Sequence, residues 1–292
     1  MSAARLVLVL ITLLGATVNG ALGYGFSSIT VPVALLFYTN RILNPALVLI
    51  EVVLNAYILW VNRVSVPHVW RRVMPIIVGL GPGVALGTSL VHQVDPAWLK
   101  FATFSVLLPL ILLQAAGFRR PFGAERPLGL AFGGGVGVLY SVTTVSGPPL
   151  AILLNNQGLA KGEFRAALGL IRLAESTLTA LAYSFAGMFT GGDSVTLVPF
   201  IVPSLVIGVP LGAWLIRHVR PETFRRVCMS FDAWVVGFGI SVLLQQLRIL
   251  ETGAAYLVLA AVVLLDTWLL YRFFSGKASP AAVVPEHSLL RR

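Results

Sequence analysis

The chain has 292 residues, of which 57% are hydrophobic and only 11% are charged, and its mean hydropathy is +0.89. A soluble domain carries about 25% charged residues, so this composition excludes a water-exposed globular surface and indicates lipid as the solvent. Because one membrane span needs about 20 apolar residues, the length can hold about eight to ten membrane segments and no large soluble domain.

The net charge of +10 does not indicate a nucleic-acid partner, because the basic residues gather in short loops and at the C-terminus. Under the positive-inside rule, the basic loops 63–72, 117–127 and 217–226 and the tail are predicted to be cytoplasmic. We therefore expect a multi-pass protein of the cell (inner) membrane, with the lipid bilayer as its surroundings.

Enzyme chemistry has no support in the sequence. The single cysteine, Cys228, permits no disulfide within the chain and no cysteine-based metal site. No span carries a histidine–carboxylate cluster or a serine–histidine pair, and no phosphate-binding Gly-Lys-Ser/Thr loop is present. We expect neither catalysis, nor a metal, nor a cofactor, nor direct use of ATP.

Two segments are too rich in glycine and proline for single uninterrupted spans, because both residues break helices. Residues 5–39 open the chain, and their apolar start is not read as a cleaved signal peptide because a similar segment recurs at 128–157. Apolar runs predict the other spans, at 42–62, 73–94, 97–116, 164–187, 194–216, 227–247 and 253–272.

Loop charge sets the predicted topology. The loop 117–127 is basic and therefore inside, whereas 188–193 has no basic residue and is expected outside. The segment 128–157 must then begin and end inside, which favours a re-entrant hairpin, since 30 residues are too few for two spans. The same argument puts both ends of 5–39 outside, with the N-terminus external and the C-terminus cytoplasmic. Arg5 and Arg41 are the basic residues that this arrangement leaves on the outer side.

The two halves of the chain repeat one pattern, in the same order. The matches are Gly20 with Gly137, Ser27 with Thr144, Pro32 with Pro149, Ala46 with Ala166, Asn55 with Glu175, Gly83 with Gly208, Gly87 with Gly212, Val94 with Val219 and Pro96 with Pro221. We therefore predict an all-α polytopic membrane protein with two inverted repeats. Each repeat has a broken, re-entrant hairpin and three transmembrane helices, and one extra helix follows at the C-terminus.

The predicted organisation follows from this repeat. Its parts are a first repeat at 1–116, a cytoplasmic linker at 117–127, a second repeat at 128–247, an extra helix at 253–272 and a disordered cytoplasmic tail at 273–292. The patterns Gly83-x-x-x-Gly87 and Gly208-x-x-x-Gly212 are typical of helices that approach each other closely.

The two broken segments, Gly15 to Pro32 and Gly133 to Pro149, each followed by a helix, resemble the sulfite exporter TauE/SafE family. Residues 79–101, with Gly83, Gly87 and Pro96, resemble that family's third helix and the turn after it. The likeness covers about residues 5–247. It implies transport of a small sulfur-containing anion, such as sulfite or a sulfonate, often outward.

The hydroxyl and amide groups of the broken segments are the first candidates for binding a small anion. Half-helix N-termini there would add backbone N–H groups and partial positive charge. The alternative is that these hydroxyls only satisfy loosened backbone carbonyls. The candidate residues are Asn19, Ser27, Ser28, Thr30, Ser141, Thr143, Thr144 and Ser146.

Charged residues inside predicted spans are the second group of candidates, because such residues usually face a cavity or a partner. We expect Arg172 to attract the anion, and Glu51 or Glu175 to take up and release a proton. The alternative is a self-neutralising Arg172–Glu175 pair that only supports its helix. Asp232 is expected at the membrane interface, close to a helix start, and Asp266 on the last helix is given no part in the site.

The function predicted from these features is secondary transport of a small anion, and both proton coupling and a homo-oligomer are left open. A passive anion channel, or a transporter of another small solute on the same fold, is the alternative. A membrane enzyme is disfavoured by the missing catalytic groups. A scaffold subunit would leave the hairpin glycines and buried charges without a purpose.

Overall fold

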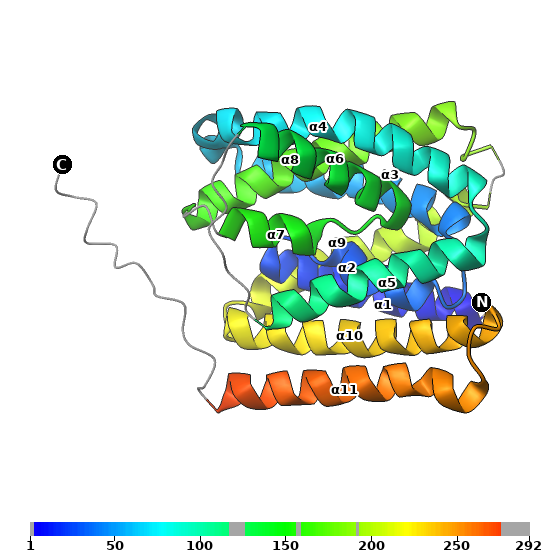
Figure 1. Ribbon diagram of the computed structural model, residues 1–292. Helices are drawn as coiled ribbons and strands as arrows, with labels where there is room; N and C mark the ends of the chain where they lie inside the picture. The colour runs from blue at the N-terminus through cyan, green and yellow to red at the C-terminus, as the bar shows by residue number, and fades with distance from the viewer. Residues whose placement is uncertain (1–2, 117–125, 156–158, 191–192, 276–292) are drawn as a thin grey trace.

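The computed structural model describes residues 3–116, 126–155, 159–190 and 193–275, and within these ranges it is a helical bundle without strands (Figure 1). The helices are α1 Ala3–Leu22, α2 Phe26–Ala34, α3 Asn40–Val61, α4 Val66–Gln93, α5 Pro96–Ala115, α6 Arg126–Thr143, α7 Gly147–Asn155, α8 Lys161–Phe185, α9 Val198–Leu215, α10 Pro221–Gln246 and α11 Thr252–Phe274. Two short 3-10 helices, Arg63–Ser65 and Val195–Leu197, lead into α4 and α9.

Seven helical stretches in the described part of the chain are long and apolar enough to cross a membrane. They are α1, α3, α5 and α11, α4 and α9 with their leading 3-10 turns, and most of α10. The helix α8 has 25 residues, so its length is sufficient, but it is less apolar than these seven. It packs against α3 and α4, and these neighbours separate its polar residues from lipid.

Both glycine-rich segments are interrupted helices, as predicted. The first breaks between α1 and α2, where Gly23 and Gly25 have φ of 84° and 108°, a left-handed conformation that favours glycine. The two helices then pack against each other, with Gly15 facing the Phe26 carbonyl and the Thr30 hydroxyl. The second segment breaks between α6 and α7 at Thr144, whose φ of 55° is uncommon for a residue with a side chain.

The first helix of each broken segment packs along a helix from the other half of the chain. The helix α1 lies along α9, and α6 lies along α4. A Cβ on Gly212 would lie 1.8 Å from the Thr17 carbonyl oxygen, and one on Gly83 would lie 2.1 Å from that of Gly134. The predicted role of these small-residue patterns in close helix packing is therefore confirmed.

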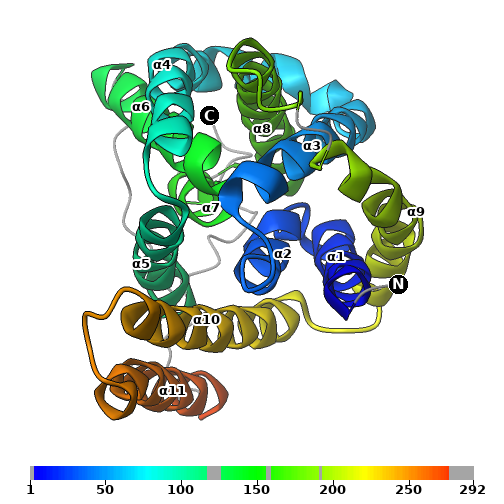
Figure 2. The ribbon, with the colours of Figure 1, turned by 90° about the vertical axis from the view of Figure 1, so that its right-hand side faces the viewer.

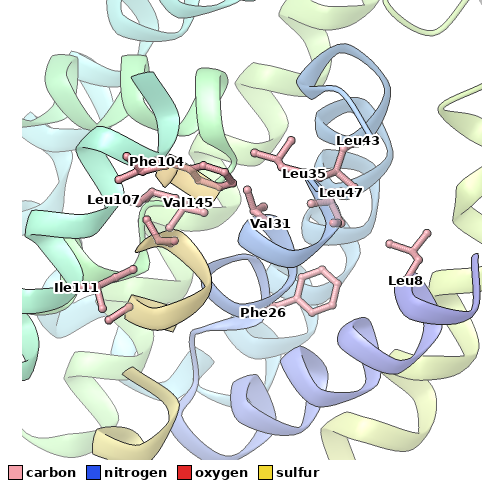
Figure 3. Packing of buried hydrophobic residues seen from close by; sticks show 14 of the residues in the cluster. Leu8, Phe26, Val31, Leu35, Leu43, Leu47, Phe104, Leu107, Ile111 and Val145 are labelled. Atoms are coloured by element: carbon pink, nitrogen blue, oxygen red, sulfur yellow. The ribbon is translucent and has the colours of Figure 1, made fainter. Parts of the chain in front are cut away.

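An apolar core surrounds α2 in the middle of the bundle. Phe26 and Val31 of α2 pack with residues of α1, α3, α5 and α10, as Figure 3 shows. In the end-on view of Figure 2, α2 and α7 both lie toward the centre, inside the longer helices. The labelled members of this core are Leu8, Phe26, Val31, Leu35, Leu43, Leu47, Phe104, Leu107, Ile111 and Val145.

Arg41, a basic residue on the expected outer side, caps the end of α4. Its Nε donates to the Val91 carbonyl at 3.0 Å, and its Nη2 donates to the carbonyls of His92 and Val94 at 2.8 and 2.9 Å. The last carbonyls of a helix lack intrahelical partners and carry partial negative charge. Arg41 therefore has a structural task that explains a cation at this place.

The last helix, α11, lies beside α10 at the edge of the bundle (Figures 1 and 2). Arg226 of α10 donates to Asp266 Oδ1 at 2.7 Å, and Trp234 Nε1 donates to Asp266 Oδ2 at 3.1 Å. The arginine is 3% exposed and the aspartate is fully buried. The assignment of Arg226 to a basic loop ending at residue 226 is therefore wrong, because α10 begins at Pro221.

The interfacial placement of Asp232 is wrong for the same reason. Counted from Pro221, Asp232 lies about 16 Å along α10, and its side chain is buried. The predicted division into repeats, with boundaries at 116 and 128, stays a prediction. Most of the linker 117–127 and of the tail 273–292 lies outside the described residues.

Candidate functional site

Three charged side chains meet between α3 and α8, which pack against each other near the middle of their lengths. Arg172 Nη2 donates to Glu51 Oε1 at 2.8 Å, and Arg172 Nε lies 4.0 Å from Glu175 Oε1. The arginine is 2% exposed and both glutamates are fully buried. The alternative of an isolated Arg172–Glu175 pair is therefore wrong, because the closer partner of Arg172 comes from the other half of the chain.

Hydroxyl groups from the two broken segments complete this charged cluster. Ser27, in the first turn of α2, donates to Glu51, and Ser146, directly before α7, donates to Glu175. Tyr140, near the end of α6, donates to Glu51 Oε2 at 2.7 Å. Each glutamate thus accepts a hydrogen bond from a serine at a helix break, which ties both breaks to the α3–α8 pair.

The arginine retains unused hydrogen-bonding capacity. Nε and Nη1 of Arg172 have no hydrogen-bond partner, and neither has Oε2 of Glu175, although all are buried. Buried polar groups in folded proteins are nearly always paired, so unpaired protein groups indicate a strained site or a place for a ligand or an ordered water. The free donors of Arg172 belong to a guanidinium, whose flat fork suits an oxyanion.

Several other predicted residues do not reach this cluster. Ser141 and Thr143 donate to the carbonyls of Gly137 and Leu139 on their own helix, at 2.7 Å each. Thr144 donates to the carbonyl of Thr143 at 2.7 Å. Their prediction as anion-binding residues therefore has no support in these contacts, because the hydroxyls satisfy loosened backbone as the alternative supposed.

The remaining predicted residues lie in or beside α1 and α2. The side-chain amide of Asn19 and the hydroxyl of Thr30 are buried without hydrogen-bond partners. Ser28 follows Ser27 along α2 but lines a separate pocket. The amide and the hydroxyl remain candidate groups for binding the solute.

Side chains from α3 and α8 cap the broken end of α6, because carbonyls released by a break inside a membrane need donors. The amides of Asn40 and Asn44 donate to the Val142 carbonyl at 3.1 and 2.6 Å. Tyr183 donates to the carbonyl of Ser141. The break is therefore held in one defined geometry by groups on both sides of the bundle.

The N-termini of the two short helices differ as anion sites. At the start of α2, Phe26, Ser27 and Ser28 each carry a backbone N–H that helix geometry leaves without an intrahelical acceptor. At the start of α7, Pro148 and Pro149 have no N–H to offer, which leaves Gly147 as the donor of that turn. The helix dipole favours an anion at the N-terminus of either helix, but the N-terminus of α2 offers more backbone hydrogen-bond donors than that of α7.

The two helix breaks face each other. A Cβ placed on Gly147, directly after the second break, would lie 3.2 Å from the ring of Tyr24 in the first break and 3.7 Å from Ser28 Oγ. Short helices from both halves therefore converge beside the charged cluster. Sequence analysis missed Tyr140, although a tyrosine directly before the run Ser141 to Ser146 was a usable sign.

Apolar helices of membrane-spanning length, with a buried charged cluster where two interrupted helices meet, define a multi-pass membrane protein of the transporter class. Comparison with known proteins makes this assignment specific. The chain belongs to the sulfite exporter TauE/SafE family, whose model matches residues 8–240. That match includes both breaks and the charged cluster, and it ends before α11.

Two relatives illustrate the likeness. A protein of Cupriavidus necator named "Probable sulfite/organosulfonate exporter TauE" is 28% identical over 188 residues, which is 61% of this chain and 70% of the relative. A protein of Comamonas testosteroni named "Probable inner membrane transporter protein TsaS" is 26% identical over 163 residues, which is 54% of this chain and 66% of the relative. No solved structure matches the chain.

Proposed function

We propose that this chain is a secondary transporter of a small anion of the sulfite or organosulfonate type, and that Arg172 binds the anion. The observation that carries the proposal is the buried guanidinium with two unpaired donors at the meeting point of both helix breaks. The unpaired Nη1 group can donate charge-assisted hydrogen bonds to an oxyanion. The sulfite and organosulfonate chemistry comes from the family and from the name of the Cupriavidus relative.

Charge balance favours coupling to protons. With both glutamates ionised, the cluster of Arg172, Glu51 and Glu175 carries one net negative charge and would repel an anion. Protonating one glutamate makes the cluster neutral, and protonating both leaves the arginine free to pair with the solute. Unit charges 4 Å apart interact by about 4 kcal/mol at an effective dielectric constant of 20, so this change decides binding.

An inverted repeat would give the cluster access to each side in turn. A Cβ on Gly20 would lie 2.1 Å from the Val209 carbonyl oxygen, and a Cβ on Gly137 would lie 2.7 Å from the Leu80 carbonyl oxygen and 3.0 Å from the Val84 backbone nitrogen. The predicted repeat pairs Gly20 with Gly137, and by the same register that aligns Gly83 with Gly208 it pairs Val84 with Val209. The two halves thus support each other through equivalent contacts, as alternating access by rocking of repeats requires. The proposed setting is the cell (inner) membrane, with the N-terminus outside and the C-terminus in the cytoplasm.

The test is a flux assay in proteoliposomes with sulfite, thiosulfate, organosulfonates, sulfate and carboxylates, each with and without a pH gradient. We expect flux of a sulfur oxyanion that the pH gradient accelerates. Flux that ignores the pH gradient would instead support a passive channel on the same fold. Carboxylate flux without sulfur-anion flux would refute the proposed solute class.

Variants at the cluster make the test specific. Arg172→Ala should abolish flux, but it also leaves Glu51 buried without its cation and can destabilise the protein. The double variant Arg172→Gln, Glu51→Gln removes both members of the closest ion pair and leaves only Glu175, so it should be less destabilised than Arg172→Ala while still lacking flux. Arg63→Gln, at an exposed arginine that stacks on Trp60, is the control and should transport normally. Undiminished flux in the double variant would remove Arg172 from the site.

A further inference from the structure

A second pocket lies on the other side of α2, between the first helix break, the end of α5 and the start of α10. It is bordered by Gly25 of the break before α2 and by Pro148 in the first turn of α7, and apolar residues of α1, α5 and α10 form its walls. Its polar lining residues are Tyr24, Ser28, Gln114, Arg225, Cys228 and Asp232.

We propose that this pocket is a second anion-binding site, in which Arg225 holds the anion. No carboxylate among the described residues lies within ion-pair distance of Arg225. Gln114 is buried and donates to the Tyr24 hydroxyl at 3.3 Å, which orients both groups at the pocket. A guanidinium, an amide, a phenol and the Ser28 hydroxyl together supply the donors that a sulfonate or sulfate group requires.

The position of the pocket makes it an entrance to the charged cluster, and this reading rests on the proposed function. Ser27 and Ser28 are neighbours in the first turn of α2, yet Ser27 donates to Glu51 and Ser28 lines the pocket. The first turn of α2 therefore borders both sites, one on each side. Arg225 lies in the second turn of α10, directly after the basic loop that is expected to be cytoplasmic.

Anion binding in this pocket should depend on whether the carboxyl group of Asp232 is protonated. Its carboxyl group is 5% exposed and its Oδ1 has no hydrogen-bond partner. An ionised carboxylate would repel an anion in the same pocket, whereas a protonated one donates a hydrogen bond. Anion binding should therefore strengthen as the pH falls.

The other titratable groups around Asp232 are few. Cys228 lies one turn before it on α10, and Arg225 and Tyr24 line the same pocket. The end of α5 contributes the uncharged Gln114. The helix α11 contacts a different face of α10, where its Asp266 is held by Arg226.

The natural reporter for this site is Cys228, the one cysteine of the chain, which is half-buried in the pocket. Purified full-length protein would be treated with methyl methanethiosulfonate, a small neutral thiol reagent, and labelling would be followed by mass spectrometry. Methanesulfonate and sulfate are the anions added, because sulfite itself consumes thiol reagents. We expect either anion to slow labelling of the wild-type protein, and more strongly at low pH.

The variants separate this proposal from the first one. Arg225→Gln should raise the anion concentration needed to slow labelling of Cys228 by half, by about tenfold or more, because a charge-assisted hydrogen bond is lost. Arg220→Gln, at an exposed arginine of the same basic loop, is the control. In this variant the anion should protect Cys228 from labelling as it does in the wild-type protein. Asp232→Asn should still show protection but lose its pH dependence. The double variant Arg172→Gln, Glu51→Gln should keep protection even though it lacks flux.

Two results would overturn the proposal. They are labelling that neither anion slows and protection that persists in Arg225→Gln. Loss of protection in the Arg172→Gln, Glu51→Gln variant would place the anion at the charged cluster instead. Failure of flux with intact protection would refute the transport proposal and leave this site standing.

Discussion

The glycines of α6 let two helices touch, and one of them offers a direct test of that packing. A Cβ added to Gly133 would lie 2.1 Å from the carbonyl oxygen of Ile76 on α4, and the obstructing atoms are backbone. Since ordinary Cβ contacts begin near 3.4 Å, α4 and α6 would have to separate by about 1 Å. Overpacking of this kind costs about 1–3 kcal/mol.

Gly135, two residues along the same helix, is the matched control. A Cβ at Gly135 would meet nothing within 4 Å. Both substitutions by alanine gain about 1 kcal/mol of helix propensity, so this term cancels when the two variants are compared. The difference between Gly133→Ala and Gly135→Ala therefore isolates the steric cost, and Gly133→Ala should be the less stable by about 1–3 kcal/mol.

Thermal unfolding in mild detergent, followed by tryptophan fluorescence, would measure this difference. In proteins of about this size, 1 kcal/mol corresponds to about 2–4 °C in Tm, so Gly133→Ala should melt several degrees below Gly135→Ala. Gly212→Ala should also lower the Tm, because its Cβ would meet the Thr17 carbonyl on α1. Equal Tm values for the Gly133 and Gly135 variants would refute the close-contact argument.

Two further predictions concern the last helix and the topology. Asp266→Ala leaves Arg226 buried without its carboxylate, so the free energy of unfolding should fall by about 3–5 kcal/mol, and an unchanged Tm in detergent would contradict a structural role for the pair. In a Cys228→Ser background, a membrane-impermeant maleimide should label Val64→Cys only from the cytoplasmic side and Thr190→Cys only from outside. Both positions are exposed, and labelling from one common side would contradict the predicted topology.

Much of the fold could be predicted because lipid leaves few choices for a backbone. Runs of apolar residues predicted the long helices, and clustered glycine and proline predicted both breaks, at 23–25 and 144–146. Helix starts were harder. The polar first turns of α10, which include Arg226, looked like loop in a hydropathy profile, so Asp232 was placed too near the surface. Tertiary pairing with Asp266, which no local pattern reveals, makes that buried arginine tolerable.

The charged part of the site could also be predicted, since a charge inside an apolar span is costly unless it has a partner or a function. Glu51, Arg172 and Glu175 were found in this way. Hydroxyls were less predictable, because a serine at a helix break can bind either a distant carboxylate or its own backbone. Ser146 does the first and Ser141 does the second, and their sequence surroundings are alike.

The polar character of α8 has a consequence for how the protein is made. On its own this helix is a poor candidate for entry into lipid, because Arg172 and Glu175 lie in its middle. Its partner Glu51 belongs to α3, which leaves the ribosome earlier and is itself strongly apolar. The first half of the chain therefore supplies the carboxylate that pairs with Arg172 before α8 is made, so α8 need not enter the membrane with an unpaired arginine.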